Sequence, residues 1–349
     1  MDGYGQLGNG QYVYQNIPVH VSTLGANVVD VHADGYNTCA RKNDGTLWCW
    51  GNNFDGQLGD GTTGGESCNF NQFCQSLPIQ VVQLSNKSAG VSLSSIHVCA
   101  FENTGWLWCW GYNMDGELGL GYKNTSVLSP ALVGATGANV IEVATGSNHT
   151  CARKTDGTVW CWGYGHNGEL GDGHSNLQDP IPTQVVNLDT NAVQISAGGS
   201  HSCAVKNDGT AWCWGSNTYG EIGDGTNIDR GVPTQITSLG NSVSEISAGY
   251  YHTCARKTDG TVWCWGWNVS GQLGDGTTTN RNLPVQVSLL GSDAAQLSLG
   301  GNYQYGQSCV LKTNGTVWCW GSNIYGQLGN GQTALVVSSP VQANTLNCQ

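Results

Sequence analysis

Charge is scarce in this chain of 349 residues, and basic charge is the scarcest. Charged residues make up 10% of the sequence, with 12 Lys and Arg against 24 Asp and Glu, so the formal net charge is −12. A protein without an excess of basic side chains displaces few counterions from phosphate groups. The composition therefore excludes a nucleic-acid partner, and such an acidic chain also gains little from anionic lipid.

Long apolar runs are missing as well. No stretch approaches the roughly 20 apolar residues that a bilayer-spanning helix needs, and none has the form of a signal peptide. We therefore expect no membrane insertion. The chain starts directly in repeat material, MDGYGQLGNG, so we also expect further sequence upstream of Met1.

The signatures of common enzymes and metal sites are absent. The sequence contains no GxSxG, HExxH, phosphate-loop or CxxC motif. Its glycine-rich segments, such as GYGQLG, precede strand patterns and not the start of a helix, where a phosphate would bind. Spatial separation decides whether paired carboxylates hydrolyse glycosides, but Glu is scarce. We predict a protein that is not an enzyme and that holds no cofactor and no metal.

Glycine and cysteine are abundant, with 52 and 15 copies, and most cysteines follow one rule, Cys-x9-Cys. A turn such as NDG, TDG or TNG lies between the two cysteines, which is typical of a β-hairpin. If the turn is a three-residue loop with a left-handed glycine, Lys42 faces Thr46 and Cys39 lies opposite Cys49. Cross-strand neighbours of this kind are close enough for a disulfide, whereas zinc sites usually show CxxC spacing. The pairs are Cys39/Cys49, Cys99/Cys109, Cys151/Cys161, Cys203/Cys213, Cys254/Cys264 and Cys309/Cys319.

Three cysteines fall outside this rule. Cys68 and Cys74 lie in an insertion at 64–75, and we predict that they join to each other and pin that loop. Cys348 is left unpaired, which suggests a partner in upstream sequence or in another chain. So many disulfides indicate an oxidising compartment, so we place the protein outside the cell or at its surface, as a secreted protein.

A second motif, G-x-[LI]-G-x-G, divides the chain into repeats of about 51–60 residues. Periods of this length are typical of propeller blades. Each full period predicts four strands, which in the third period are 140–146, 149–154, 158–163 and 182–186. Alternation along the third strand puts Trp160 and Trp162 on one face and Cys161 on the other. We therefore predict an all-β protein, a β-propeller of four-stranded antiparallel blades.

The block HTCARKTDGTVWCWGYGHNGELGDG, followed by PTQVV, resembles the repeat of the regulator of chromosome condensation family. The resemblance covers essentially the whole chain and implies a propeller with seven blades. It says little about function, because one fold carries many functions. The paired cysteines are more similar to bacterial secreted members, such as β-lactamase inhibitor protein II, than to nuclear ones.

Six complete blades can be counted in the sequence, in a single domain that spans 1–349. Residues 1–24 resemble the outer-strand remnant of an incomplete blade, with a fourth-type strand at 17–21. Three interpretations remain open: a six-bladed ring with a spare strand, a seven-bladed ring that upstream sequence completes, or a ring that another chain completes. An unpaired strand edge is an aggregation hazard, which favours completion.

Strands that alternate in direction sort the connections onto two faces. The hairpin turns gather basic residues on one face, and we expect these to be solvated and paired with the aspartates of the same turns. The opposite face gathers long loops rich in Tyr, Trp, Asn and Gly, a composition suited to protein recognition. An alternative is that these aromatics pack against a neighbouring loop. The candidates on this face are Phe54, Tyr112, Tyr164, Tyr219, Trp267, Tyr325, Asp60, Asp172, Asp224 and Asp275.

Four histidines stand two positions before the first cysteine of their repeats, at 97, 149, 201 and 252. Asn37 and Gln307 take the same position in the other repeats. A slot that accepts an amide predicts a hydrogen-bonding role and not a metal ligand. A ring would also hold these imidazoles too far apart for one ion.

Two functions fit these observations. The first is an extracellular, non-catalytic binding module that recognises a protein, or less readily a glycan, through the long loops. The alternative is a structural subunit of a surface layer or filament, assembled through the terminal strand and Cys348. The second function predicts self-association, and the first predicts a separate protein partner.

Overall fold

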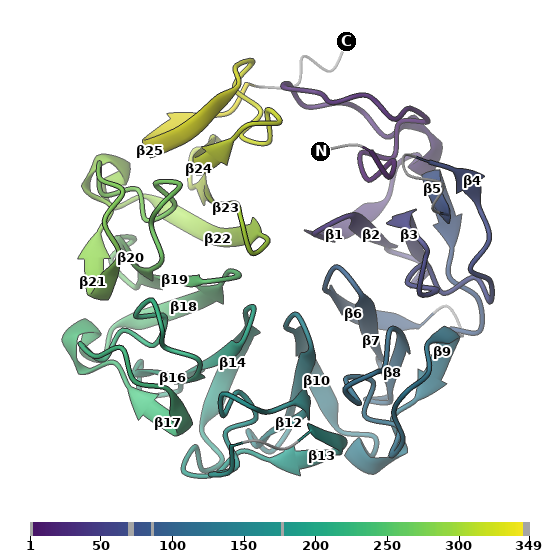
Figure 1. Ribbon diagram of the computed structural model, residues 1–349, viewed down its shortest axis with the longest axis horizontal. Helices are drawn as coiled ribbons and strands as arrows, with labels where there is room; N and C mark the ends of the chain where they lie inside the picture. Colours follow the sequence, from purple (N-terminus) through teal and green to yellow (C-terminus); the bar gives the residue numbers. More distant parts are fainter. Residues whose placement is uncertain (1–2, 69–72, 85–86, 176–177, 345–349) are drawn as a thin grey trace.

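The computed structural model describes residues 3–68, 73–84, 87–175 and 178–344. The extended elements in these ranges are β-strands, and the helical pieces are single 3-10 turns. The strands form six antiparallel sheets that stand like blades around a central channel (Figure 1). The prediction of an all-β propeller with four-stranded blades is confirmed.

Each blade uses consecutive strands, the first beside the channel and the fourth at the rim. Blade 1 has β1 (Val28–Asp34), β2 (Asn37–Lys42), β3 (Leu47–Asn52), β5 (Phe73–Gln80) and a short extra strand, β4 (Glu66–Ser67). Blade 2 has β6 (Ser88–Leu93), β7 (His97–Glu102), β8 (Leu107–Gly111) and β9 (Val127–Leu132), and blade 3 has β10 (Val140–Thr145), β11 (His149–Lys154), β12 (Val159–Tyr164) and β13 (Gln178–Gln184). Blade 4 has β14 (Ala192–Ala197), β15 (His201–Lys206), β16 (Ala211–Gly215) and β17 (Arg230–Gln235), and blade 5 has β18 (Val243–Ala248), β19 (His252–Lys257), β20 (Val262–Gly266) and β21 (Arg281–Gln286). Blade 6 has β22 (Ala294–Gly301), β23 (Gly306–Lys312), β24 (Val317–Asn323) and β25 (Ala334–Gln342), and the 3-10 turns are η1 (Ser22–Leu24), η3 (Gly134–Thr136), η4 (Thr237–Leu239) and η5 (Ser288–Leu290).

The hairpin between the second and third strands has the geometry that the cysteine spacing predicts. In blade 1 the Lys42 amide donates to the Thr46 carbonyl at 2.9 Å, and Gly45 has a φ of 80°. Cys39 lies opposite Cys49 with their Cα atoms 4.1 Å apart, as in a non-hydrogen-bonded pair. Disulfides join Cys39–Cys49, Cys68–Cys74, Cys99–Cys109, Cys151–Cys161, Cys203–Cys213, Cys254–Cys264 and Cys309–Cys319. Cys348 lies outside the described residues.

Neighbouring blades pack through one repeated core. In β12, Trp162 and Trp160 pack against blade 2, whereas Cys161 packs on the other side with Trp214 of blade 4. This arrangement confirms the predicted alternation. Trp162 is fully buried, as are Trp110, Trp214, Trp265 and Trp320, so blades 2 to 6 each place a buried indole in the core shared with the preceding blade.

The fourth strands lie earlier in the sequence than predicted. The pattern PTQVV predicts a strand over 182–186, but β13 covers Gln178–Gln184 and Val185 lies beyond it. An outer strand bonds to one neighbour only, so it tolerates prolines such as Pro180 and needs no apolar pattern. Val185 instead leaves the sheet and packs into the core between blades 3 and 4.

Residues 17–21, predicted to be a strand, are not assigned to one in the structure. A strand needs a bonded neighbour, and the described part of the chain offers no third strand beside this segment. The N-terminal segment, purple in Figure 1, lies at the rim between β25 and β5. The Gly331 amide donates to the Asn16 carbonyl at 2.7 Å, which ties the segment to blade 6.

Candidate functional site

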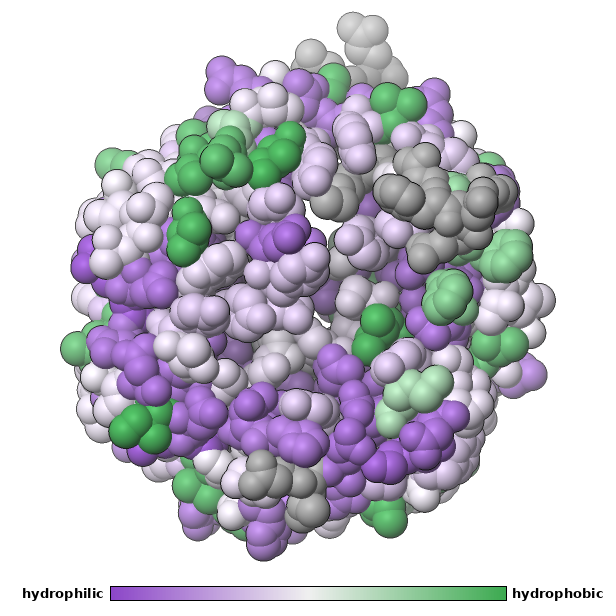
Figure 2. Space-filling model, in the orientation of Figure 1, coloured by the Kyte–Doolittle hydropathy of each residue, from purple (hydrophilic) through white to green (hydrophobic). Residues whose placement is uncertain are grey.

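The long loops after each third strand and the turns between first and second strands lie at the same end of every blade. We call this end the loop face, and we call the opposite end, with the hairpin turns, the turn face. The first strands line the channel between the two faces. Figure 2 shows one face of the ring, with an open centre and apolar residues in small separate groups among hydrophilic ones.

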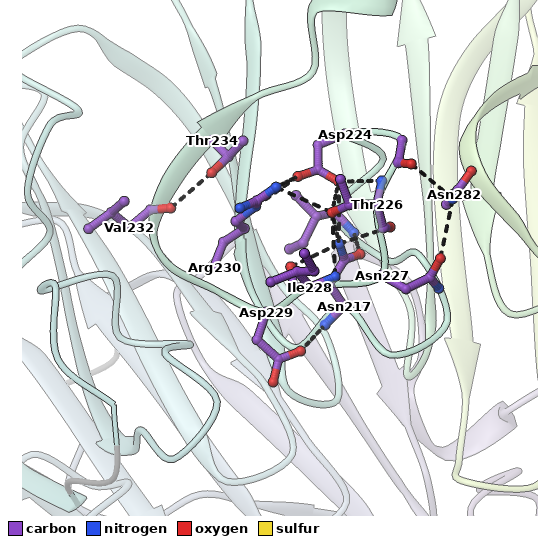
Figure 3. Close-up of polar contacts among 12 residues, drawn as sticks. Asn217, Asp224, Thr226, Asn227, Ile228, Asp229, Arg230, Val232, Thr234 and Asn282 are labelled. Atoms are coloured by element: carbon purple, nitrogen blue, oxygen red, sulfur yellow. Dashed lines mark hydrogen bonds and ion pairs between the residues drawn. The ribbon is translucent and has the colours of Figure 1, made fainter.

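Asp224, a predicted binding residue, holds its own loop together (Figure 3). Its Oδ1 accepts hydrogen bonds from the Thr226 amide and hydroxyl, at 2.9 and 2.7 Å, and its Oδ2 accepts one from Arg230 Nε at 2.7 Å. Burial of Asp224 acts to raise the pKa of its carboxyl, but the bonds from Thr226 and Arg230 outweigh it and hold that pKa below its usual value. Asn217 completes the loop by donating to the Ile228 carbonyl at 3.1 Å.

The other three predicted aspartates also serve the loops that carry them. Asp275 repeats this arrangement with Thr277 and Arg281. Asp60 accepts from the Thr62 amide, and Asp172 from the amide two residues on, His174. The side chains of Asp224 and Asp275 are 7% and 4% exposed, so these two carboxylates offer almost no surface to a partner.

The long loops of blades 1 to 5 also bury a Gln or a Glu just after the first glycine of the G-x-[LI]-G-x-G motif. The side-chain oxygen accepts the amide hydrogen of the residue two positions before it, as with Gln57 and Asp55 at 2.9 Å. Burial raises the pKa of Glu117 to about 8, and the pKa values of Glu169 and Glu221 to about 7. Glutamine takes the same slot in the other loops, and the burial that raises these pKa values favours a neutral side chain there.

The four histidines at 97, 149, 201 and 252, which we call the histidine column, join one blade to the next through hydrogen bonds. His97 Nε2 lies 2.8 Å from the Thr150 hydroxyl, and that hydroxyl donates to the Glu117 carbonyl at 2.8 Å. The hydroxyl must therefore accept from Nε2–H, which fixes the neutral tautomer. Burial lowers the pKa of His97 to about 3 and that of His149 to about 4. The hydrogen-bonding role predicted for this position is confirmed.

Blade 1 shows that histidine and hydroxyl form a unit. Its position holds Asn37, and blade 2 has Val98 where the other blades have a hydroxyl. Asn37 Nδ2 turns to the Asn52 carbonyl of its own blade, at 2.6 Å. Where the next blade lacks a hydroxyl, the histidine is missing too.

The predicted aromatic residues differ in their exposure and in the side chains that lie next to them. Phe54 is 58% exposed, whereas Tyr112, Tyr164, Tyr219, Trp267 and Tyr325 are half-buried. The structure brings Tyr219 and Trp267 together, with ring centroids 6.0 Å apart.

The loop-face aromatics include residues that the sequence analysis missed. Tyr250 and Tyr251, in the turn between β18 and β19, join Tyr219 and Trp267 in one cluster, with Tyr251 5.2 Å from Tyr219 and 5.7 Å from Trp267. Their signal was in the sequence: the turn before His252 is GYY, where the repeats of blades 3 and 4 have GSN and GGS. We call Tyr219, Tyr250, Tyr251 and Trp267 the aromatic cluster.

The remaining predicted tyrosines have other neighbours. Tyr325 meets Tyr14 at 5.3 Å and Tyr305 at 6.1 Å. Tyr164 lies 4.6 Å from the ring of His166. The loop face thus carries aromatic groups at several places, supplied by turns as well as by long loops.

On the turn face the predicted pairing of basic residues with turn aspartates is wrong. Arg153 pairs with Glu142 of the first strand, at 2.6 Å, and Lys154 lies over the Trp160 ring. Asp156 accepts the Thr158 amide and hydroxyl instead. The turn aspartate shapes the hairpin, and the cations are neutralised or stacked elsewhere.

Among the described residues, no three His, Cys, Asp or Glu side chains gather where they could hold a metal ion. The same residues include no helix long and apolar enough to cross a membrane.

Comparisons with known proteins agree with this architecture. The chain is 30% identical over 334 residues to the ultraviolet-B receptor UVR8 of Arabidopsis thaliana, covering 94% of this chain and 73% of the receptor. It is 32% identical over 304 residues to the human E3 ubiquitin-protein ligase HERC2, covering 84% of this chain but 6% of the ligase.

Solved structures show the same fold. Prp20p from Saccharomyces cerevisiae superposes with a TM-score of 0.83 at 20% identity, covering 100% of this chain and 85% of that one. Human WBSCR16 superposes with a TM-score of 0.80 at 21% identity, covering 95% and 85%. The RCC1-like domain family matches residues 2–348. The chain belongs to the RCC1-like domain family.

Proposed function

We propose that this propeller is an extracellular, non-catalytic binding module that recognises a protein partner through its loop face. The observation that carries the proposal is the aromatic cluster of Tyr219, Tyr250, Tyr251 and Trp267, which is half-buried and whose side chains are not repeated from blade to blade. Large aromatic side chains supply much of the energy of protein interfaces at little entropic cost. Prp20p, which has the same fold, is described as binding Gsp1p and histones, which supports protein recognition on this scaffold.

Charge supports the choice of face. The turn face carries both signs, whereas the loop face is acidic, so it favours a partner with a basic surface and a fast, salt-dependent association. Apart from the buried carboxyls and the two arginine-paired aspartates described above, the acidic residues on the loop face are Asp55, Asp60, Glu66, Asp115, Asp172, Asp179 and Asp229, and the basic residue there is Lys123.

The disulfides support the extracellular setting. Six hairpin disulfides and a seventh in the 64–75 insertion persist only where thiols are not kept reduced. A ring stapled in this way gives its loops a rigid base, which lowers the entropy lost when a partner binds.

The test is a binding screen against an array of secreted and cell-surface proteins, followed by titration of each hit. The variant Tyr219→Ala/Tyr251→Ala/Trp267→Ala should weaken the binding of true partners at least tenfold. Leu289→Ala is the control, since this exposed side chain lies in η5, toward the turn face, and its binding should match the unaltered chain. Equal binding by the triple variant would exclude the cluster as the recognition surface.

A further inference from the structure

Five of the six blades carry the same polar unit where their hairpins reach the turn face. In blade 3, Lys154 Nζ lies 4.0 Å from the centroid of the Trp160 ring, and the Trp160 Nε1–H donates to the Thr158 hydroxyl at 3.1 Å. Gln184, in the fourth strand, lies opposite Trp160. The other four blades repeat the threonine, the glutamine and the lysine stack, at 4.4–5.0 Å, and their lysines are Lys42, Lys206, Lys257 and Lys312. The repeat thus holds a cation over each of these indoles.

Blade 2 keeps the indole of this unit and replaces everything around it. Trp108 has the position of the tryptophan, but Glu102 stands where the other blades have lysine, and Trp106 where they have threonine. Leu132 lies opposite Trp108 in place of the glutamine. The Trp108 Nε1–H is buried without an acceptor, because the threonine hydroxyl is missing. Among the residues that the structure describes, no Lys or Arg side chain lies over the Trp108 ring.

These replacements change the surface of the turn face at blade 2. Trp106 and Leu132 are 37% and 41% exposed. Phe101 takes the position of the arginine in blades 1, 3 and 5, and its ring packs against Gly90. The segment FENTGW at 101–106 has one carboxylate and no cation, whereas RKTDGT at 153–158 has two cations and one carboxylate. Blade 2 thus presents an apolar and negative end between blades 1 and 3, which present cations.

We infer that this end of blade 2 is a second interaction site, which binds a lysine side chain of a partner protein. We call its members, Glu102, Trp106, Trp108 and Leu132, the blade 2 patch. In this site the partner's ammonium group takes the place over Trp108 that the chain's own lysines take over the equivalent indoles. The patch lies on the turn face, so this binding goes beyond the proposed recognition through the loop face.

Charge and shape select the occupant of the blade 2 patch. The face of an indole ring attracts cations, and the Glu102 carboxylate adds a negative charge at the position where a lysine is missing. Trp106 and Leu132 offer exposed apolar surface to the methylene stem of a lysine. On the turn face the chain's own Arg153 pairs with the carboxylate of Glu142, whereas its lysines lie over indoles. The occupant is therefore a lysine and not an arginine.

The first experiment titrates the full chain with the peptide acetyl-Gly-Lys-Gly-amide and follows the indole N–H signals by NMR. We expect saturable shifts of the Trp106 and Trp108 signals, and a peptide with glutamine in place of lysine should shift them at least fivefold less. Glu102→Lys gives blade 2 a lysine of its own, as in the other blades, and should reduce the shifts at least fivefold. Asn103→Lys adds the same charge to an exposed position of the same turn. It is the control and should keep most of the shift.

A second arm leaves blade 2 unaltered and opens the equivalent place in blade 3. Lys154→Glu removes the lysine from the Trp160 ring, so the lysine peptide should then shift the Trp160 indole signal, which it does not shift in the unaltered chain. The inference is overturned if the lysine peptide shifts Trp106 and Trp108 no more than the glutamine peptide does, or if Glu102→Lys binds it equally well. It is also overturned if Trp160 does not respond in the Lys154→Glu variant. None of these outcomes depends on the loop face.

Discussion

Trp265 and Trp267 stand two residues apart and represent two different regions of the molecule, the blade interfaces and the loop face. Trp265 is fully buried, donates to the Glu221 carbonyl at 2.7 Å, and has an equivalent in every blade. Trp267 is half-buried, and its equivalents include Asn52, Ser216 and Ser322. Repeated positions therefore hold the ring together, whereas positions that vary between repeats are free to serve recognition.

The largest expected effect on the interfaces comes from pH. Glu117, Glu169 and Glu221 have folded pKa values of about 7 to 8, above the value in an unfolded chain. Their contribution to stability is therefore complete below about pH 4.3 and is lost as pH rises to about 8. The buried histidines act in the opposite sense, because their lowered pKa values make stability fall as pH drops below about 6.5.

The two effects oppose each other, so the stability of the chain should peak where they balance, between about pH 4.3 and about pH 6.5. The variant Glu117→Gln/Glu169→Gln/Glu221→Gln should gain several kcal/mol, as an order of magnitude, at pH 8 over the unaltered chain. At pH 4, where all three carboxyls are mainly protonated in both states, the two proteins should differ little. Urea unfolding at both pH values measures the difference, and an equal change at both would refute the role assigned to these carboxyls.

The hairpin disulfides come next in magnitude. Cys151→Ala/Cys161→Ala should lower the free energy of unfolding by about 2–3 kcal/mol, since the link constrains a short loop in the unfolded chain. Urea unfolding without reductant gives the value. A cost below about 0.5 kcal/mol would show that the staple adds nothing to the hairpin ladder.

The histidine column should show coupling between blades. Thr150→Val alone leaves the His97 ring without its partner and should cost about 1–3 kcal/mol. Adding His97→Asn rebuilds the Asn37 and Val98 arrangement of blades 1 and 2, so the double variant should cost less than the sum of the single ones. Strict additivity in this double-mutant cycle would contradict the unit that we describe.

On the turn face, Thr158→Ala removes the bonds to Asp156 and to the Trp160 indole. The expected cost is about 1 kcal/mol. Thr155→Ala, in the same exposed turn, is the control and should change the free energy of unfolding by less than about 0.5 kcal/mol. If the two variants cost the same, the hydroxyl of Thr158 has no special role.

Much of the fold could be predicted because the same pattern of strands and turns recurs in each repeat of the sequence. The Cys-x9-Cys spacing predicts the register of every hairpin, since a three-residue turn allows only one pairing of Cys39 with Cys49. The fourth strands were misplaced by a few residues, because an edge strand with one neighbour needs no apolar alternation and Val185 belongs to the core and not to the sheet. The partners of Arg153 and Lys154 also lie outside their own turn, where local pattern cannot show them.

The site was harder to predict than the scaffold. Tyr250 and Tyr251 lie in the turn between β18 and β19, whereas Tyr219 and Trp267 lie in two different long loops, and only the ring brings these three connections together. From the sequence alone, the aspartates of the GDG motif are expected to be open to a partner. In the structure, the carboxylate of Asp224 already accepts hydrogen bonds from Thr226 and Arg230 of its own loop. The meaning of a polar residue in a glycine-rich loop depends on bonds that periodicity does not reveal.

The measurement that tests the division between the two regions most directly is the free energy of unfolding of Trp267→Ala beside that of Trp265→Ala. The account predicts a loss of about 3–5 kcal/mol for Trp265→Ala, which empties a core, and a loss below about 1.5 kcal/mol for Trp267→Ala, which removes ring contacts at a half-exposed surface. Equal losses in the free energy of unfolding would contradict this account. Trp267 would then stabilise the fold as a packing residue, and it would not be a side chain that the loop face presents to a partner.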